Sequence, residues 1–127
     1  MTTEETLHRI LNATLAEKIK WNLTIFERNQ HSNNGVIPAE MTYAASFRVV
    51  TEKAGAFTRQ SNDKILITKN IEGKYYFSIR VDGMIVSYIA DDDLSDKELL
   101  KKIYLAASKS TDRAVWGDLS EFITTLD

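Results

Sequence analysis

The chain of 127 residues is 43% hydrophobic and 27% charged, a composition typical of a soluble globular protein. This length suits one compact domain with its own core, and we expect a single domain over residues 1–127. The sequence contains no cysteine, which excludes disulfide bonds, thiolate metal sites and cysteine nucleophiles.

The net charge of −2 is unevenly distributed along the chain. Residues 41–80 carry seven basic and three acidic side chains, whereas residues 81–127 carry five basic and ten acidic ones. A basic segment is one feature of nucleic-acid-binding proteins, and the face that it would offer consists of Arg48, Arg59, Lys64, Lys69, Lys74 and Arg80. The whole chain lacks the basic excess of a phosphate binder, so the favoured interpretation is that these residues keep exposed strands soluble.

The N-terminal residues, Met1 to Glu5, are acidic and lack the apolar segment of a signal peptide. No uninterrupted apolar run approaches the ~20 residues that are needed to span a bilayer. We therefore expect a cytoplasmic protein without a membrane partner.

The first half of the chain predicts a helix followed by short strands. Thr2 or Thr3 can cap a helix whose apolar residues recur with helical spacing, and these are Leu7, Ile10, Leu11, Leu15 and Ile19. Alternating apolar and polar residues then predict strands over residues 21–28 and 43–50. Gly55 predicts a turn before a short strand over residues 56–59, and residues 61–63 predict a break.

Residues 64–91 predict a β-meander, because Asp82-Gly83 between two apolar runs is a strong hairpin signal. The preceding turn would hold either two residues (72–73) or four (70–73), and both choices give the same alternation. Leu66 and Thr68 would then share the face of Phe77. The opposite face would form a mixed apolar surface, our candidate interaction face, of Ile65, Ile67, Tyr76, Arg80, Ile85 and Ile89.

The C-terminal third predicts two helices. Residues 95–98 match a capping box, and the apolar residues from Leu99 to Ala107 have helical spacing. Residues 108–112 are polar and predict a break. A final amphipathic helix would follow, with Trp116, Leu119, Phe122, Ile123 and Leu126 as its apolar face. The predicted fold is therefore α+β, with an N-terminal helix, an antiparallel sheet of about five strands and two C-terminal helices.

No motif in the sequence predicts catalysis, a cofactor or a metal. The acidic residues 91–93 fail the EF-hand pattern, since Asp96 and Lys102 stand where glycine and glutamate are required. His8 and His31 have no neighbour in sequence that completes a catalytic set, and the glycines form no phosphate loop. We expect no catalytic, cofactor-binding or metal-binding residues.

The layout resembles a group of small, mostly uncharacterised bacterial and phage proteins. The resemblance rests on Lys20-Trp21 with Lys18 nearby, the meander of residues 64–90 and the helical segment of residues 99–107. It implies a cytoplasmic accessory protein of a phage, plasmid or genomic island, and it carries no catalytic residues to transfer.

From these patterns we expect a non-catalytic protein-interaction module that self-associates as a homodimer through the candidate interaction face. The other arrangement is that the N-terminal helix covers this face and leaves a monomer. Its protein partner and biological process are not indicated. The first alternative is a nucleic-acid-binding accessory protein that uses the basic region of residues 41–80. The second is a small enzyme whose site is assembled in space from residues distant in sequence.

Overall fold

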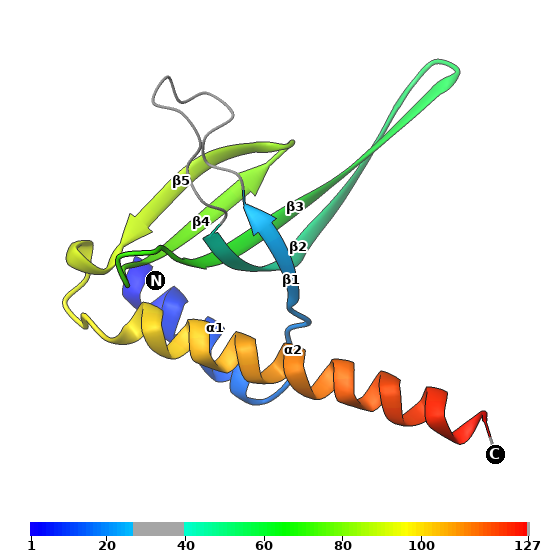
Figure 1. Cartoon of the computed structure of the whole chain (residues 1–127). Helices are drawn as coiled ribbons and strands as arrows, with labels where there is room; N and C mark the ends of the chain where they lie inside the picture. Colours follow the sequence, from blue (N-terminus) through cyan, green and yellow to red (C-terminus); the bar gives the residue numbers. More distant parts are fainter. Residues whose placement is uncertain (27–39, 127) are drawn as a thin grey trace.

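The protein was analysed as a computed structural model that describes residues 1–26 and 40–126. Five strands form one antiparallel sheet in the order β1-β2-β3-β4-β5, flanked by two α-helices (Figure 1). The elements are α1 (Thr3–Leu15), β1 (Asn22–Phe26), β2 (Glu40–Ala54), β3 (Phe57–Lys69), β4 (Tyr75–Val81), β5 (Met84–Ala90), the 3-10 turn η2 (Asp91–Asp93) and α2 (Leu99–Thr124). The α+β class and the antiparallel sheet are confirmed.

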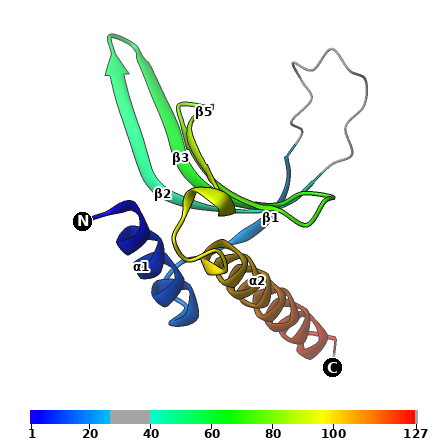
Figure 2. The same ribbon diagram turned by 90° about the vertical axis from the view of Figure 1, so that its left-hand side faces the viewer.

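Both helices lie on the same face of the sheet (Figure 2). α1 packs beside α2, and the N-terminal half of α2 covers strands β3 and β4. The helix side of the core consists mainly of apolar side chains, with Leu99, Leu100 and Ile103 completely buried. Ile67 and Phe77 face them from the sheet. Within the described residues, neither helix combines the length and apolar character needed to cross a membrane.

The predicted N-terminal helix is confirmed as α1. Thr2 caps it, because its hydroxyl accepts a hydrogen bond of 3.1 Å from the backbone N–H of Glu5. The end of α1 is fixed to the entry of the sheet by the buried indole of Trp21, whose Nε1 donates to the hydroxyl of Thr14 at 3.0 Å. This contact satisfies the polar atom of a Trp that is otherwise packed in the core.

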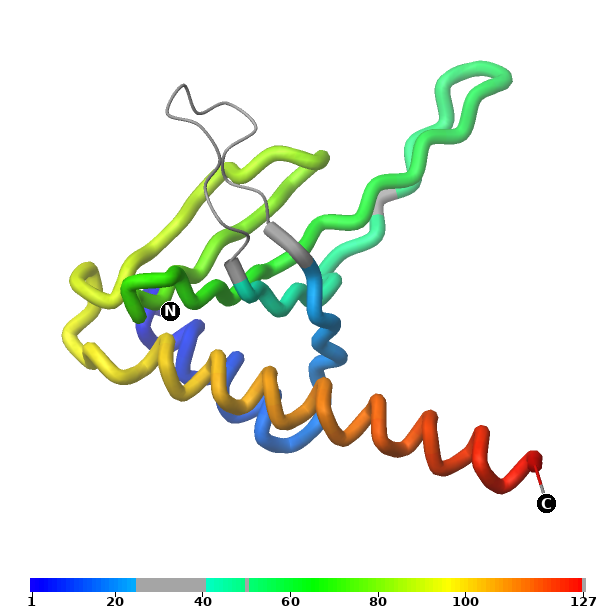
Figure 3. The backbone as a smooth tube through the Cα atoms, in the orientation of Figure 1, coloured from blue at the N-terminus to red at the C-terminus, as the bar shows by residue number. Residues whose placement is uncertain are grey.

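Strands β2 and β3 form one long hairpin, so the break that we predicted at residues 61–63 is wrong. The turn is at Gly55, which has a positive φ of 62°, and Ala54 pairs with Phe57 beside it. The polar residues at the predicted break continue β3, because Asp63 is buried and fully bonded there. The distal part of this hairpin projects away from the sheet as a two-stranded arm (Figure 3).

The register between β3 and β4 corrects the predicted faces. Ile67 pairs with Phe77 and Lys69 with Tyr75, so an odd number of residues separates the strands. Asn70 and Lys74 close a turn around three residues, 71–73, with Gly73 at a φ of 85°. With a turn of two or four residues, Ile65 and Ile67 would lie on the side of the sheet opposite Phe77. A turn of three residues puts them on the same side. Ile65 and Ile67 therefore share the helix-covered face with Phe77.

The hairpin between β4 and β5 begins as predicted and then shifts by one residue. Val81 pairs with Met84 across Asp82-Gly83, whose φ angles of 56° and 81° are both positive. A bulge follows, and beyond it Phe77 pairs with Ile89 instead of Tyr88. Ile89 therefore packs against the core, and Tyr88 lies on the opposite face.

The C-terminal third forms one helix, so the prediction of two helices is wrong. The polar residues 108–112 continue the helix because their hydroxyl groups have partners. Thr111 donates to the carbonyl of Ala107 at 2.9 Å, and Ser108 accepts from the Tyr43 hydroxyl at 3.1 Å. The predicted capping box is wrong as well, since α2 begins at Leu99 and the backbone N–H of Ser95 donates to Glu4 instead.

Candidate functional site

The largest group of exposed apolar side chains on one element of the described chain is on the C-terminal half of α2. Five large side chains there, together with Leu126 two residues beyond the end of the helix, are each 44–65% exposed, and we call these six residues the α2 stripe: Val115, Trp116, Leu119, Phe122, Ile123 and Leu126. Figure 1 shows this half of the helix leaving the sheet and α1 behind. Large side chains of this kind are normally buried when they cluster on one side of a helix.

The last hydrogen bond and the last ion pair between α2 and the body of the protein, among the described residues, are formed by Thr111 and Arg113. The Thr111 hydroxyl lies 3.3 Å from the Trp21 carbonyl, and Arg113 forms an ion pair with Glu17. Beyond Arg113, the described chain shows only hydrogen bonds within α2 itself. The stripe therefore belongs to a free helical extension.

The α2 stripe is not a continuation of the core-facing side of the helix. At about 100° per residue, its centre is rotated by about 120° from the side that carries the buried Leu100, Ile103 and Ala107. The acidic Asp118 and Glu121 lie outside the stripe on the same scale. The apolar face thus changes sides along one uninterrupted helix. An extension that had merely lost its contact with the core would keep the core-facing side apolar.

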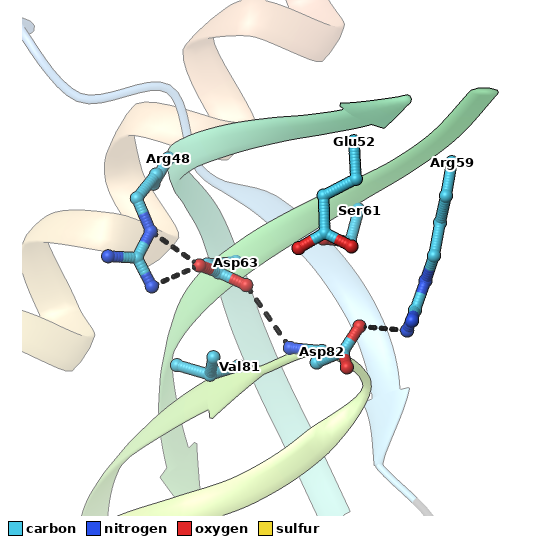
Figure 4. A pocket seen from close by; sticks show the side chains of 7 residues that line it. All are labelled: Arg48, Glu52, Arg59, Ser61, Asp63, Val81 and Asp82. Carbon is cyan, nitrogen blue, oxygen red and sulfur yellow. Dashed lines mark hydrogen bonds and ion pairs between the residues drawn. The ribbon is translucent and has the colours of Figure 1, made fainter. Parts of the chain in front are cut away.

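A second feature is a hollow of about 210 Å³ between the base of the arm and the β4–β5 turn (Figure 4). It is lined mainly by charged side chains, and all the lining residues are Arg48, Glu52, Arg59, Ser61, Asp63, Val81 and Asp82. Arg59 forms an ion pair with Asp82 across it. Because a catalytic site assembled in space brings charged side chains together, this hollow is the candidate for such a site.

The chemistry of the hollow is dominated by Asp63, which is almost completely buried. One carboxylate oxygen accepts from Arg48 Nε at 2.6 Å, and the other accepts from the backbone N–H of Asp82 at 3.1 Å. Burial raises the pKa of this carboxyl, but the bonds from Asp82 and Arg48 outweigh it and hold the pKa below the usual 3.8. An ionised carboxylate whose oxygens are both bonded fastens the arm to the β4–β5 turn. It is poorly suited to accept a proton from a substrate.

Two of the three acidic residues at 91–93 accept hydrogen bonds from backbone N–H groups. Asp91 Oδ2 accepts from the N–H of Tyr75 at 3.1 Å, and Asp93 accepts from the N–H of Ala90 at 2.9 Å. Burial raises the pKa of Asp91. Among the residues that the structure describes, no group of three or more histidine, aspartate or glutamate side chains could hold a metal ion. Of the two histidines, His8 is exposed on α1, and His31 lies outside the described residues.

Three tyrosines meet between the sheet and α2. Tyr104 lies 5.3 Å from the ring of Tyr43 and 5.3 Å from the ring of Tyr75, edge to face in both cases. Burial raises the pKa of Tyr104, so its hydroxyl stays protonated. These rings belong to the core packing.

The structure separates the residues of the candidate interaction face. Ile65 and Ile67 are buried, and Ile89 packs beside them on the helix-covered side. Tyr76, Arg80 and Ile85 belong to the other side of the sheet. The shared face that we predicted is therefore wrong, because it depended on an even-numbered turn after β3 and on an unbroken register between β4 and β5.

The structure also divides the six basic residues of the proposed nucleic-acid face. Arg48, Arg59 and Lys74 each have a carboxylate partner, namely Asp63, Asp82 and Asp92. Lys64 lies opposite Arg80 in the register of β3 and β4, so these two residues share one side of the sheet. Lys69 is five residues further along β3 and therefore lies on the other side.

Sequence reasoning found five residues of the α2 stripe, all but Val115, and assigned them to the apolar face of a separate C-terminal helix. The signal that sets the stripe apart from the core-facing side is the phase of the pattern. The apolar positions up to Ala107 and those from Val115 onward do not lie on one side of a continuous helix. Comparison with known proteins found no matching family model, curated protein or solved structure.

Proposed function

We propose that this protein is a non-catalytic module that binds another protein chain through the C-terminal half of α2. The observation that carries this proposal is the α2 stripe, six exposed apolar side chains turned away from the protein's own core. Keeping such a surface in water forgoes roughly 1.5–3 kcal/mol for each large side chain that a partner would bury. An exposed stripe on a stable helical support is the form that helix-mediated recognition takes.

The polar features of the described chain support a non-catalytic role. Asp63 has the most buried carboxylate, and each of its two oxygens accepts a hydrogen bond from within the fold. The carboxylates of Asp91 and Asp93 hold backbone N–H groups. From the resemblance in layout we further propose a cytoplasmic accessory role in a phage, plasmid or genomic island.

Nucleic-acid binding remains the alternative. The pairing of three of the six basic residues with carboxylates reduces the positive charge that a phosphate backbone would meet. No feature of the described residues favours it over the α2 stripe.

Site-specific photo-crosslinking in cells of the source organism tests the proposal. A photoreactive phenylalanine analogue at Leu119 should form covalent adducts with protein, because this position lies within the stripe. The same analogue at Ala114, which is exposed outside the stripe, serves as the matched control. We expect at least fivefold more adduct from position 119. Equal yields at both positions, or none at either, would contradict the proposed function.

A further inference from the structure

We infer that the occupant of the α2 stripe is a second copy of this chain, paired antiparallel through residues 115–126. This inference rests on the proposed function and names its partner. It replaces the sheet-mediated homodimer that the sequence predicted, because the isoleucines of that face are divided between two sides of the sheet.

The spacing of the stripe is that of a helix-pairing seam. Trp116, Leu119, Ile123 and Leu126 recur at intervals of three, four and three residues, which is the alternation of a and d positions in a coiled coil. Val115 and Phe122 widen the seam on one side. A seam of this kind is complementary to another seam of the same period, and the stripe itself supplies one.

Charge selects the antiparallel orientation. Lys109 and Asp112 occupy the next a and d positions towards the N-terminus. In a parallel pair each would face its own copy, and like charges would be held together at the interface. In an antiparallel pair centred near residue 121, Trp116 faces Leu126 of the second copy, and Leu119 faces its Ile123. Lys109 and Asp112 then lie beyond the end of the partner helix.

The available surface matches the lower range of stable interfaces. With large side chains of this type, the exposed fractions amount to roughly 600 Å² per copy, or about 1,200 Å² for the pair. Because both helices are already formed, little conformational entropy is lost when this interface assembles.

The shape of the molecule leaves room for this arrangement. The C-terminal half of α2 extends clear of the sheet and of α1 in both views (Figure 1, Figure 2). In the antiparallel pair the two bodies lie at opposite ends of the shared helical segment, so neither obstructs the other.

Sedimentation or light scattering over a range of micromolar concentrations gives the first test. The wild-type protein should pass from 14.4 kDa to twice that mass as its concentration rises. The double variant Leu119→Glu/Ile123→Glu should remain at 14.4 kDa throughout, with unchanged helicity. Ala114→Glu, which introduces a charge outside the stripe, should dimerise like the wild type.

A spin label gives the orientation. The chain has no cysteine, so Lys102→Cys, an exposed position of α2 outside the seam, carries the only label and leaves Lys109 and Asp112 intact. The antiparallel register puts the two labelled backbone positions about 57 Å apart, because each residue adds 1.5 Å and the two-fold axis lies near residue 121. A parallel pair would hold them at roughly 10 Å.

The outcomes separate this inference from the proposed function. A dimer that survives Leu119→Glu/Ile123→Glu, or a short distance between labels at position 102, overturns the antiparallel pair. So does a wild-type protein that stays monomeric while Trp116 remains accessible to an aqueous quencher. In that last case, crosslinking from position 119 to a different protein would still support the proposed function. Absence of crosslinking would overturn both.

Discussion

At the scale of single residues, the buried Asp63 has the clearest energetic role. Its carboxylate accepts from Arg48 on β2 and from the backbone of Asp82 in the β4–β5 turn, so one side chain holds three strands in place. An ionised group of this kind stabilises the fold only as long as both partners remain bonded to it.

Asp63→Asn should make stability less dependent on acid pH. The folded-state pKa of Asp63 lies below its usual 3.8, so its contribution is present above that value and is lost as pH falls through the folded-state pKa. Urea unfolding at neutral pH and near pH 3 measures this. The variant should unfold at lower urea than wild type at neutral pH, and the difference should narrow in acid.

Asp118→Asn is the control for this prediction, because it removes an exposed carboxylate from the free part of α2. Its urea midpoint should follow that of the wild type at both pH values. If Asp63→Asn and Asp118→Asn behave alike, Asp63 does not stabilise the fold through its charge.

At the scale of elements, α2 contains two segments with different energetic roles. Ile103→Ala should lower the free energy of unfolding by about 3 kcal/mol, because Ile103 is completely buried in the core. Ile123→Ala, the same chemical change twenty residues along the same helix, should cost less than about 0.5 kcal/mol. Urea unfolding at concentrations that keep the protein monomeric measures both. Similar losses would mean that residue 123 packs against the body.

Two glycines should respond in opposite directions to alanine. Gly73 has a φ of 85° in the three-residue turn, so Gly73→Ala should destabilise the protein by about 1 kcal/mol. Gly117 lies within α2 with no atom close to where a Cβ would stand, so Gly117→Ala should stabilise the helix by up to about 1 kcal/mol. Thermal unfolding monitored at a helical wavelength measures both changes.

Local signals predicted the elements well and the register poorly. Thr2 as a cap and Asp82-Gly83 as a turn act within four residues, and both are confirmed. The faces of the sheet depended on whether the turn after β3 held an odd or an even number of residues. Asn70 favours the odd number, because its backbone N–H donates to the carbonyl of Lys74 and its side-chain oxygen accepts from the backbone N–H groups of Glu72 and Lys74. A change of one residue in the length of the turn exchanges the two sides of the sheet.

The same limitation applies to the candidate site. The helical spacing of Trp116, Leu119 and Ile123 was visible in the sequence, but the break at residues 108–112 was not real. Once those polar residues continue the helix, the apolar face must turn away from the core. Whether polar side chains break a helix depends on tertiary partners such as Tyr43 and Trp21, which no local pattern contains.

At the scale of the whole molecule, several basic side chains form ion pairs with carboxylates of the same chain. We expect the protein to bind single-stranded DNA or RNA no more tightly than micromolar at physiological salt, because Arg48, Arg59 and Lys74 are already paired with carboxylates. Fluorescence anisotropy over a salt series measures this. A salt-sensitive nanomolar complex that is abolished by Arg80→Glu and Lys74→Glu would instead establish the nucleic-acid alternative.

Because α2 is uninterrupted, the number of residues between the core and the stripe fixes their separation and their relative orientation. Sixteen residues separate Ala107 in the core from Ile123 in the stripe, which corresponds to about 24 Å along the axis. Inserting two residues between them would turn the stripe by about 200°, whereas inserting seven would return it to within about 20° and move it about 10 Å outward. The number of residues between the core and the stripe, and not the identity of the exposed polar residues there, therefore sets the direction in which the stripe faces.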